Sequence, residues 1–503
     1  MLNKNYFKYL FQNKKIAWIF FLIMYMAVSL SSFISLGTTY SAKLNFAFKC
    51  SFVLSCIMTF VLPIFLFSFV HRKRSCDLYF SLPIERKELL STTILFSFTL
   101  TFGFFILTTL VAILLCMSHI TINLIAYLQT ILFVGFSSLA LLLINSSIYL
   151  LANNIFDGIL MLAAYLVIPV SICIVLSVIS NVFLIDFLVN KINGGIYFSP
   201  IAIVWTNASV LMSDIVHSAD TIAYFEPFSN VYVILLFIYT IIFSYLLKKN
   251  FIDRKTERAE QISDTFLSYP FIINYYLLVS LIILGLTCTE EGINDGYVIL
   301  YILLYFVYIV ALFIYKRKIN FYWKNTFYYI AVMVLALGIG EIIFFNKGFG
   351  LPYTYSLSTG NTLVCNISEY DLNTSLALDT DSSSTTSVSL DITINIPTDE
   401  LDSDTYKEAV SILEDKRNQA IDAWFEKRYY EDATCTITFN STSDNSTLLY
   451  GPTYQTSNLF TLDELKTLSK CGTINISVYD YESGIDNSYS LTEYLKAVQN
   501  DFK

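Results

Sequence analysis

Long apolar segments alternate with short polar ones over the first two-thirds of the chain. Nine of these segments are apolar for the roughly 20 residues that a helix needs to cross a bilayer. They lie at approximately residues 16–36, 50–70, 93–117, 124–152, 156–181, 229–247, 271–288, 297–315 and 326–346. The pattern predicts an α-helical polytopic membrane protein with about nine transmembrane helices.

The pattern changes after residue 346. Three stretches alternate polar and apolar residues, as strands do, and one longer stretch rich in Glu, Lys and Ala favours a helix. The strand-like stretches are 385–396, 433–440 and 472–480, and the helical one is 403–426. Thr461 with Glu464, and Ser490 with Glu493, have the spacing of capping boxes that open short helices. Residues 347–503 are therefore expected to form an α+β domain.

Basic residues predict the orientation. Four polar segments, 1–15, 71–92, 248–264 and 316–325, hold 18 of the 21 basic residues that precede residue 347. Cytoplasmic loops collect Lys and Arg, so these segments and the N-terminus are expected on the cytoplasmic side of a cell membrane. Lys43 and Lys49 are exceptions in a loop expected on the outer side. Nine crossings then put the C-terminal domain outside. We divide the chain into a six-helix core (1–250), three further helices (251–346) and an extracytoplasmic domain (347–503).

Composition agrees with two regions in different solvents. The 503 residues are 55% hydrophobic and only 14% charged, whereas soluble domains are about 25% charged. The net charge of −9 combines +5 before residue 347 (21 basic, 16 acidic) with −14 after it (10 basic, 24 acidic). Nine cysteines are scattered without zinc-ligand spacing. Three of them, Cys365, Cys435 and Cys471, lie after residue 346, where one disulfide is possible.

Motifs for catalysis are missing from the sequence. It contains no GxxxxGK[ST] phosphate loop, no HExxH and no GxSxG, and only three histidines. Asp157 and Glu341 are the acids nearest the apolar segments, and each sits at a predicted helix end, where an interfacial role is favoured over a proton relay. We therefore expect no enzyme activity, no cofactor or metal in this chain and no nucleic-acid partner.

The first loop (residues 71–90) carries the most specific signal. Five apolar residues lie between two basic clusters in it, namely Leu78, Tyr79, Phe80, Leu82 and Ile84. Such a stretch can lie on a membrane surface or dock in the groove of a partner, and Pro83 would end the helix before it. The alternative is a basic loop that only sets topology.

The sequence Ser81–Leu89 (SLPIERKEL) resembles the Leu-Pro-Ile-x-Arg turn of ABC-2-type transporter permeases. In that family, a short coupling helix at this place docks on the nucleotide-binding subunit. The match covers Leu82, Pro83, Ile84, Arg86 and Leu89. It departs at Thr92-Thr93, where the family often has a Lys.

Other segments are similar to the same family. Residues 6–16 resemble its amphipathic N-terminal helix, and the apolar segment 182–228 lies where its external re-entrant helices occur. Arg254-Lys-Thr-Glu-Arg resembles a segment of the Ytr-like permeases of Firmicutes, a subset of which has extra helices and an external C-terminal domain.

The resemblance implies that the chain is the permease subunit of an exporter. A separate ATPase subunit would bind the ATP and drive transport. A second permease, identical or different, would pair with this chain in the lipid bilayer. Its ATPase-coupling loop would comprise Leu78, Tyr79, Phe80, Leu82, Pro83, Ile84, Arg86 and Leu89. Arg86 would pair with an acidic rim on the ATPase or, alternatively, snorkel at the interface. Two other functions stay open: a membrane sensor or accessory subunit whose residues 347–503 bind a ligand, and an integral membrane enzyme acting on envelope precursors. The sequence does not fix the substrate.

Overall fold

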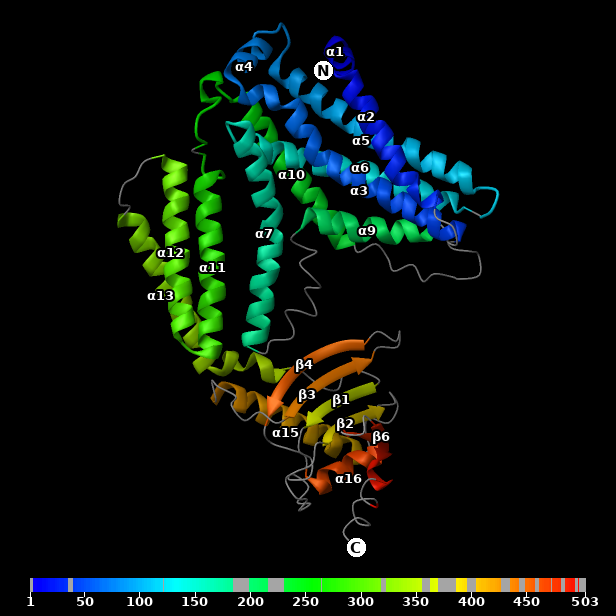
Figure 1. Ribbon diagram of the computed structural model, residues 1–503, viewed down its shortest axis with the longest axis vertical. Coiled ribbons are helices and arrows are strands. Elements are labelled where there is room, and N and C mark those ends of the chain that lie inside the picture. The colour runs from blue at the N-terminus through cyan, green and yellow to red at the C-terminus, as the bar shows by residue number, and fades with distance from the viewer. Residues whose placement is uncertain are drawn as a thin grey trace. The chain divides into compact units, whose positions relative to one another are not determined.

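A computed structural model gives the fold of the chain (Figure 1). It describes residues 3–34, 39–120, 122–183, 199–215, 230–263, 265–317, 323–354, 362–369, 386–395, 404–426, 435–442, 448–456, 461–471, 473–480, 485–493 and 496. The chain forms two compact units. The first comprises Met1–Cys173, Gly194–Tyr276 and Ala311–Lys318, and the second comprises Ile174–Asn193, Leu277–Val310 and Ile319–Lys503.

Eight of the described helices are long and apolar enough to cross a membrane. They are α3 (Tyr40–Leu66), α5 (Arg86–Cys116), α6 (Leu124–Tyr149), α7 (Ile155–Val182), α10 (Asn230–Ile252), α11 (Tyr269–Glu291), α12 (Asp295–Lys316) and α13 (Trp323–Phe345). A ninth crossing is reached if α1 (Lys4–Asn13) and α2 (Lys15–Leu30), which meet at a bend of 71°, count as one span. The prediction of a helical, multi-pass membrane protein is therefore confirmed. Asp157 lies in the first turn of α7, and Glu341 lies near the end of α13.

The second span begins earlier than predicted. Helix α3 starts at Tyr40, whereas the apolar run suggested a start near residue 50, so Lys43 and Lys49 lie on the helix and not in a loop. Thr39 caps the helix by accepting from the Ala42 N–H, and the Lys43 ammonium lies 5.5 Å from the centre of the Tyr40 ring. Long basic side chains can extend along a helix toward water, so they do not end it.

Hydroxyl and amide side chains join the helices of the first unit. The Tyr25 hydroxyl on α2 contacts Ser55 Oγ on α3 at 2.6 Å, and the Asn145 amide on α6 donates to the carbonyl and hydroxyl oxygens of Thr59 on α3 at 3.2 and 3.1 Å. These bonds satisfy polar groups that have no water partner in a bilayer.

Helix α9 (Pro200–Asp214) is an apolar helix of 15 residues, about 22 Å long and so too short to cross. It lies in the segment expected to carry external re-entrant helices, and it packs against α3 and α6 with Ile203, Val204 and Leu211 buried. The rest of that segment, 184–198 and 216–229, lies outside the described residues.

In the second unit, α11 and α13 approach closely at two glycines. A Cβ on Gly285 would lie 3.1 Å from the backbone of Ala336, and one on Gly340 would lie 2.6 Å from the Thr289 methyl group. Small residues at such contacts let transmembrane helices pack tightly.

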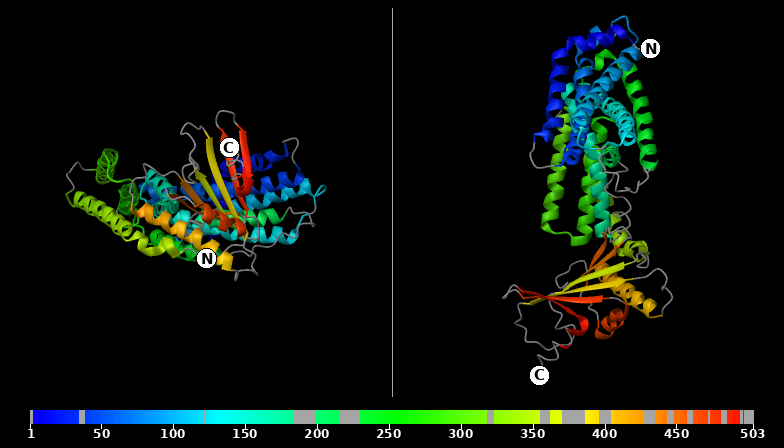
Figure 2. Two further views of the ribbon diagram at one scale, coloured as in Figure 1. Left: turned by 90° about the horizontal axis from the view of Figure 1, so that it is seen from below. Right: turned by 90° about the vertical axis from the view of Figure 1, so that its right-hand side faces the viewer.

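The described residues of the C-terminal region contain six strands in one sheet of order β4-β3-β1-β2-β5-β6, with every described pairing antiparallel. The strands are β1 (Thr362–Glu369), β2 (Thr386–Asn395), β3 (Cys435–Thr442), β4 (Leu448–Thr456), β5 (Thr473–Asp480) and β6 (Ile485–Ser490). Helices α15 (Asp404–Glu426) and α16 (Leu462–Cys471) pack on each other, and both contact the sheet (Figure 2). The side chains of Cys365, Cys435 and Cys471 lie outside the described part.

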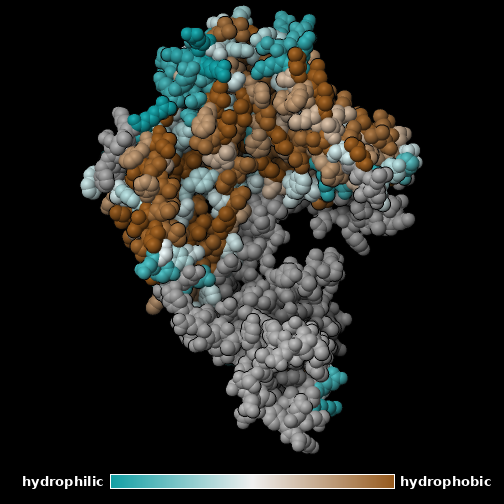
Figure 3. Space-filling model, viewed as in Figure 1, coloured by the Kyte–Doolittle hydropathy of each residue, from teal (hydrophilic) through white to brown (hydrophobic). Residues whose placement is uncertain are grey.

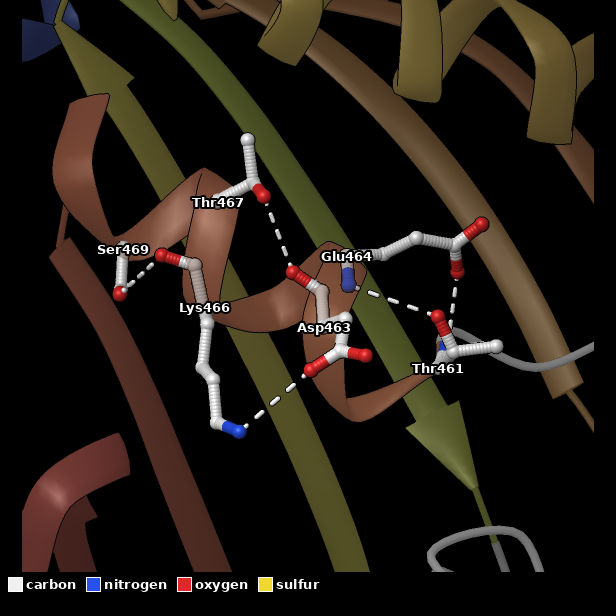
Figure 4. A network of polar contacts seen from close by, with 6 residues as sticks. All are labelled: Thr461, Asp463, Glu464, Lys466, Thr467 and Ser469. Atoms are coloured by element: carbon white, nitrogen blue, oxygen red, sulfur yellow. Dashed lines mark hydrogen bonds and ion pairs between the residues drawn. The ribbon is translucent and has the colours of Figure 1, made fainter.

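Both predicted capping boxes are confirmed. At α16, the Thr461 N–H donates to Glu464 Oε2 at 2.7 Å and the Glu464 N–H donates to Thr461 Oγ1 at 3.4 Å (Figure 4). Ser490 and Glu493 make the same reciprocal pair at 3.0 and 3.4 Å. Each box satisfies two backbone donors at the start of a helix.

Helix α15 is fastened to the end of α13 within the second unit. The Asp422 carboxylate accepts from Lys347 Nζ at 2.5 Å and from the Tyr353 hydroxyl at 2.7 Å, both in the segment that follows α13. One turn of α15 therefore has an ion pair and a hydrogen bond to the chain that leads out of the last span.

Candidate docking site on the first loop

The first loop folds as a 3-10 turn, a short helix and a tight turn. The 3-10 turn is Ser68–His71, and α4 spans Lys73–Phe80. Pro83 cannot continue a helix, and the Ile84 N–H donates to the Leu82 carbonyl at 2.7 Å, closing a three-residue turn around it. The chain then enters α5 at Arg86. The local structure is what the proline and the flanking apolar residues predict.

Five of the eight residues predicted for the coupling loop line one groove. They are Leu78, Tyr79, Leu82, Pro83 and Ile84, and the rest of the lining is the N-cap residue of α1, Asn3, with Asn5, Tyr6 and Tyr9 of α1. The volume of this first-loop groove is about 530 Å³, in the range of ligand and side-chain pockets. Leu78 is 64% exposed at its edge, a large apolar side chain available to a partner.

The other three predicted residues face the protein. Leu89 is buried, and the Phe80 ring packs edge-on against Phe251 of α10 at 5.8 Å. The Arg86 guanidinium lies 4.2 Å from the centre of the Phe80 ring, and its Nη1 donates to the carbonyls of Ile252 at 2.8 Å and Arg254 at 2.9 Å. The Ile252 carbonyl ends α10, where a cation is favoured by the helix dipole, and the Arg254 carbonyl lies two residues beyond it. Arg86 therefore fixes the start of α5 to the end of α10.

Arg254 was not predicted as a site residue, and it is a buried cation with three hydrogen bonds close to the loop. It is 5% exposed, and it donates to the carbonyls of Leu150 at 3.0 Å and Ala152 at 2.9 Å, and to Asn153 Oδ1 at 3.3 Å. These acceptors follow the end of α6. Burial lowers the Arg254 pKa to about 10, so the side chain stays charged at neutral pH. Two arginines thus cap two helix ends at this face.

His71 precedes α4, and Cys76 lies on the buried side of α4. Both are almost fully buried, and the His71 ring meets the Tyr149 ring edge-on at 4.5 Å. Burial, with the nearby charge of Arg254, lowers the pKa of His71 to about 3, so the ring is neutral. Burial raises the pKa of the Cys76 thiol, which lowers the fraction of reactive thiolate. This layer serves packing and not chemistry.

Glu260 holds the start of α4 from another segment. Its Oε1 accepts from the Lys73 N–H at 3.3 Å, at a helix start that the side chain of the N-cap residue, Arg72, does not cap. Glu260 itself has a left-handed φ of 66°, and its N–H donates to the Asn153 carbonyl at 2.9 Å. The Arg-Lys-x-Glu resemblance pointed to this stretch, but no sequence pattern could name its contacts.

The surface over this end of the first unit is polar and positive. Figure 3 shows hydrophilic side chains over α1 and α4 and a broad hydrophobic surface over the helices that follow. Arg72, Lys73 and Arg74 are exposed at the start of α4. Within the described residues, no group of three metal-ligating side chains comes together. The arrangement suits the docking of a partner with apolar and acidic groups.

No family model, curated protein or solved structure matches this chain, so its function is argued from its own residues.

Proposed function

We propose that this chain is the transmembrane permease subunit of an ABC-2-type transporter, an exporter driven by a separate ATPase subunit. The ATPase docks in the first-loop groove. The ATP is bound by the ATPase subunit and not by this chain. A second permease, identical or different, completes the path through the cell membrane. The observation that carries the proposal is the groove itself, an apolar and partly exposed docking surface on a firmly held helix.

Coupling requires that a push on α4 reach the spans. Arg86 joins the loop to the end of α10, and Arg254 joins the segment beyond α10 to the end of α6. Phe80 adds an apolar contact to α10. A load applied to Leu78 or Leu82 would therefore reach three long helices, α5, α6 and α10, through contacts that are buried or charge-assisted.

The proposed topology has the N-terminus in the cytoplasm and residues 347–503 outside as an α+β domain. One contact supports it. The Asn3 N–H donates to Thr92 Oγ1 at 3.2 Å, so the N-terminal helix and the first loop lie at the same end of the unit. An even number of crossings must separate them, which favours α2 and α3 as two crossings and nine in total. The basic residues at this end favour the cytoplasm.

The second candidate function is a membrane sensor or accessory subunit. It is favoured by the attachment of α15 to the chain after α13 through Asp422 and by the Trp424 indole, which donates to the Val182 carbonyl at the end of α7 at 3.1 Å. A ligand bound by residues 347–503 could move two spans through these contacts.

The test is recovery of the ATPase with the purified membrane protein, identified by mass spectrometry. Replacing Leu78 and Leu82 with serine should reduce the recovered ATPase at least about ten-fold, because two apolar anchors are lost from the groove. The matched control replaces Met117 and Ile125, which are 61% and 70% exposed near the opposite end of α5 and α6, with serine. Absence of any ATPase with the unaltered protein, or equal recovery from the groove variant and the control, would reject the docking role.

A further inference from the structure

A second groove opens between α5, α6 and α10. Its volume is about 570 Å³, and it lies wholly within the first unit. Its residues change character along its length. Lys87 and Ser91 of α5 and Lys248 and Ser244 of α10 line its polar part, and Leu95, Phe98 and Leu143 line its apolar part. We refer to it as the lysine groove.

The polar end follows from helix periodicity. Lys87 and Ser91 are four residues apart on α5, as are Ser244 and Lys248 on α10, so each pair lies on one helix face. Lys87 is in the first turn of α5, and Lys248 is in the last turns of α10. The chain therefore places both ammonium groups at the same end of the spans and a hydroxyl one turn deeper beside each.

Arg86 holds the two sides of this end together. Its guanidinium bonds to the Ile252 carbonyl, and Ile252 itself lines the groove one turn after Lys248. The same bond occupies a helix-end carbonyl that would otherwise repel an anion. Within the described part of the chain, neither Lys87 nor Lys248 forms an ion pair with a carboxylate.

We propose that the lysine groove binds one acidic phospholipid, with its phosphate between Lys87 and Lys248 and its acyl chains along Leu95, Phe98 and Leu143. Basic pockets between transmembrane helices select anionic headgroups because two cations gain more from a net negative lipid than from a zwitterion. The apolar walls favour a lipid over free phosphate, which would leave them uncovered. This inference does not depend on the proposed transport function.

The test is native mass spectrometry of the purified full chain titrated with dioleoyl phosphatidylglycerol or dioleoyl phosphatidylcholine. The unaltered protein should retain phosphatidylglycerol preferentially. Lys87→Gln with Lys248→Gln should lower that affinity about 25-fold, at about five-fold for each lysine near an anionic headgroup. The matched control, Lys249→Gln with Lys255→Gln, removes two exposed charges outside the groove and should change it less than about two-fold.

Two further arms locate the lipid. Leu95→Trp fills the apolar part without changing charge and should also lower phosphatidylglycerol binding, whereas inorganic phosphate should not displace the lipid. Equal retention of both lipids, equal losses in the groove and control variants, an unaffected Leu95→Trp variant, or displacement by phosphate would each overturn the assignment.

Discussion

Replacing Arg254 with methionine should loosen the whole support of the first loop. Methionine has a similar length and no donor, so Leu150 O, Ala152 O and Asn153 Oδ1 lose their partner. Three hydrogen bonds to a charged donor are worth roughly 1.5–3 kcal/mol each, together about 4.5–9 kcal/mol. The burial that lowers the Arg254 pKa from 12.5 to about 10 offsets roughly 3–4 kcal/mol, because methionine has no charge to desolvate. The net loss in the free energy of unfolding is about 3 kcal/mol, within a range of about 1–6 kcal/mol.

The global readout is thermal unfolding in detergent, where about 3 kcal/mol corresponds to a fall in Tm of roughly 6–12 °C by the scaling for domains of 150–250 residues. The local readout is Cys76, which is 0% exposed on the buried side of α4, so a variant with Cys76 as its only cysteine should react faster with a thiol reagent once Arg254 is replaced. Lys255→Met is the matched control, since it removes the same charge from an exposed neighbour and should cost less than about 0.5 kcal/mol. If both variants have the same Tm and Cys76 stays protected from the thiol reagent, the reasoning about buried helix-end caps is refuted.

Two pH-dependent predictions follow from the other perturbed groups. The folded pKa of His71 is about 3 against 6.5 unfolded, so the unfolded state binds the extra proton between these values and stability falls as pH drops from 6.5 toward 3, by up to about 1.4 kcal/mol per pH unit. His71→Leu should flatten that slope in denaturation measured across this range, and an unchanged slope would contradict the assignment. The pKa of Asp422 is lowered by the hydrogen bond from Lys347 and then by that from Tyr353, so this attachment of α15 is present above pH 3.8 and is lost as pH falls through the folded pKa. Hydrogen exchange in α15, corrected for intrinsic rates, should therefore rise in acid for the unaltered protein and be high and independent of pH for Asp422→Asn; protection of that variant at neutral pH would refute the attachment.

The membrane character could be read from the sequence because it depends on local composition. An apolar run of about 20 residues has one favourable environment, whichever neighbours it finds. Its boundaries were less certain. Helix α3 begins about ten residues before its apolar run, since Lys43 and Lys49 lie on the helix. The capping boxes were also predictable, because their bonds join residues three apart.

The first loop shows where sequence reasoning ended. Its helix and its proline turn were apparent, but eight residues were assigned to one docking surface. The fold divides them, with Leu78 and its groove neighbours facing outward and Phe80, Arg86 and Leu89 facing α10 and the core. A side chain on a short helix can face either way, and only the packing of that helix against distant segments selects the direction.

The sequence by itself determined which segments are long and apolar enough to cross a bilayer, which segments are basic and which short segments cap their own helices. The tertiary structure alone decided the partners of Arg254, whose acceptors lie about a hundred residues earlier in the chain, and the placement of Lys87 and Lys248 in one groove. The physical reason is the range of the interactions. Transfer into lipid and helix capping depend on neighbouring residues, whereas buried hydrogen bonds and binding grooves depend on which helices pack together, and many packings satisfy the same apolar pattern.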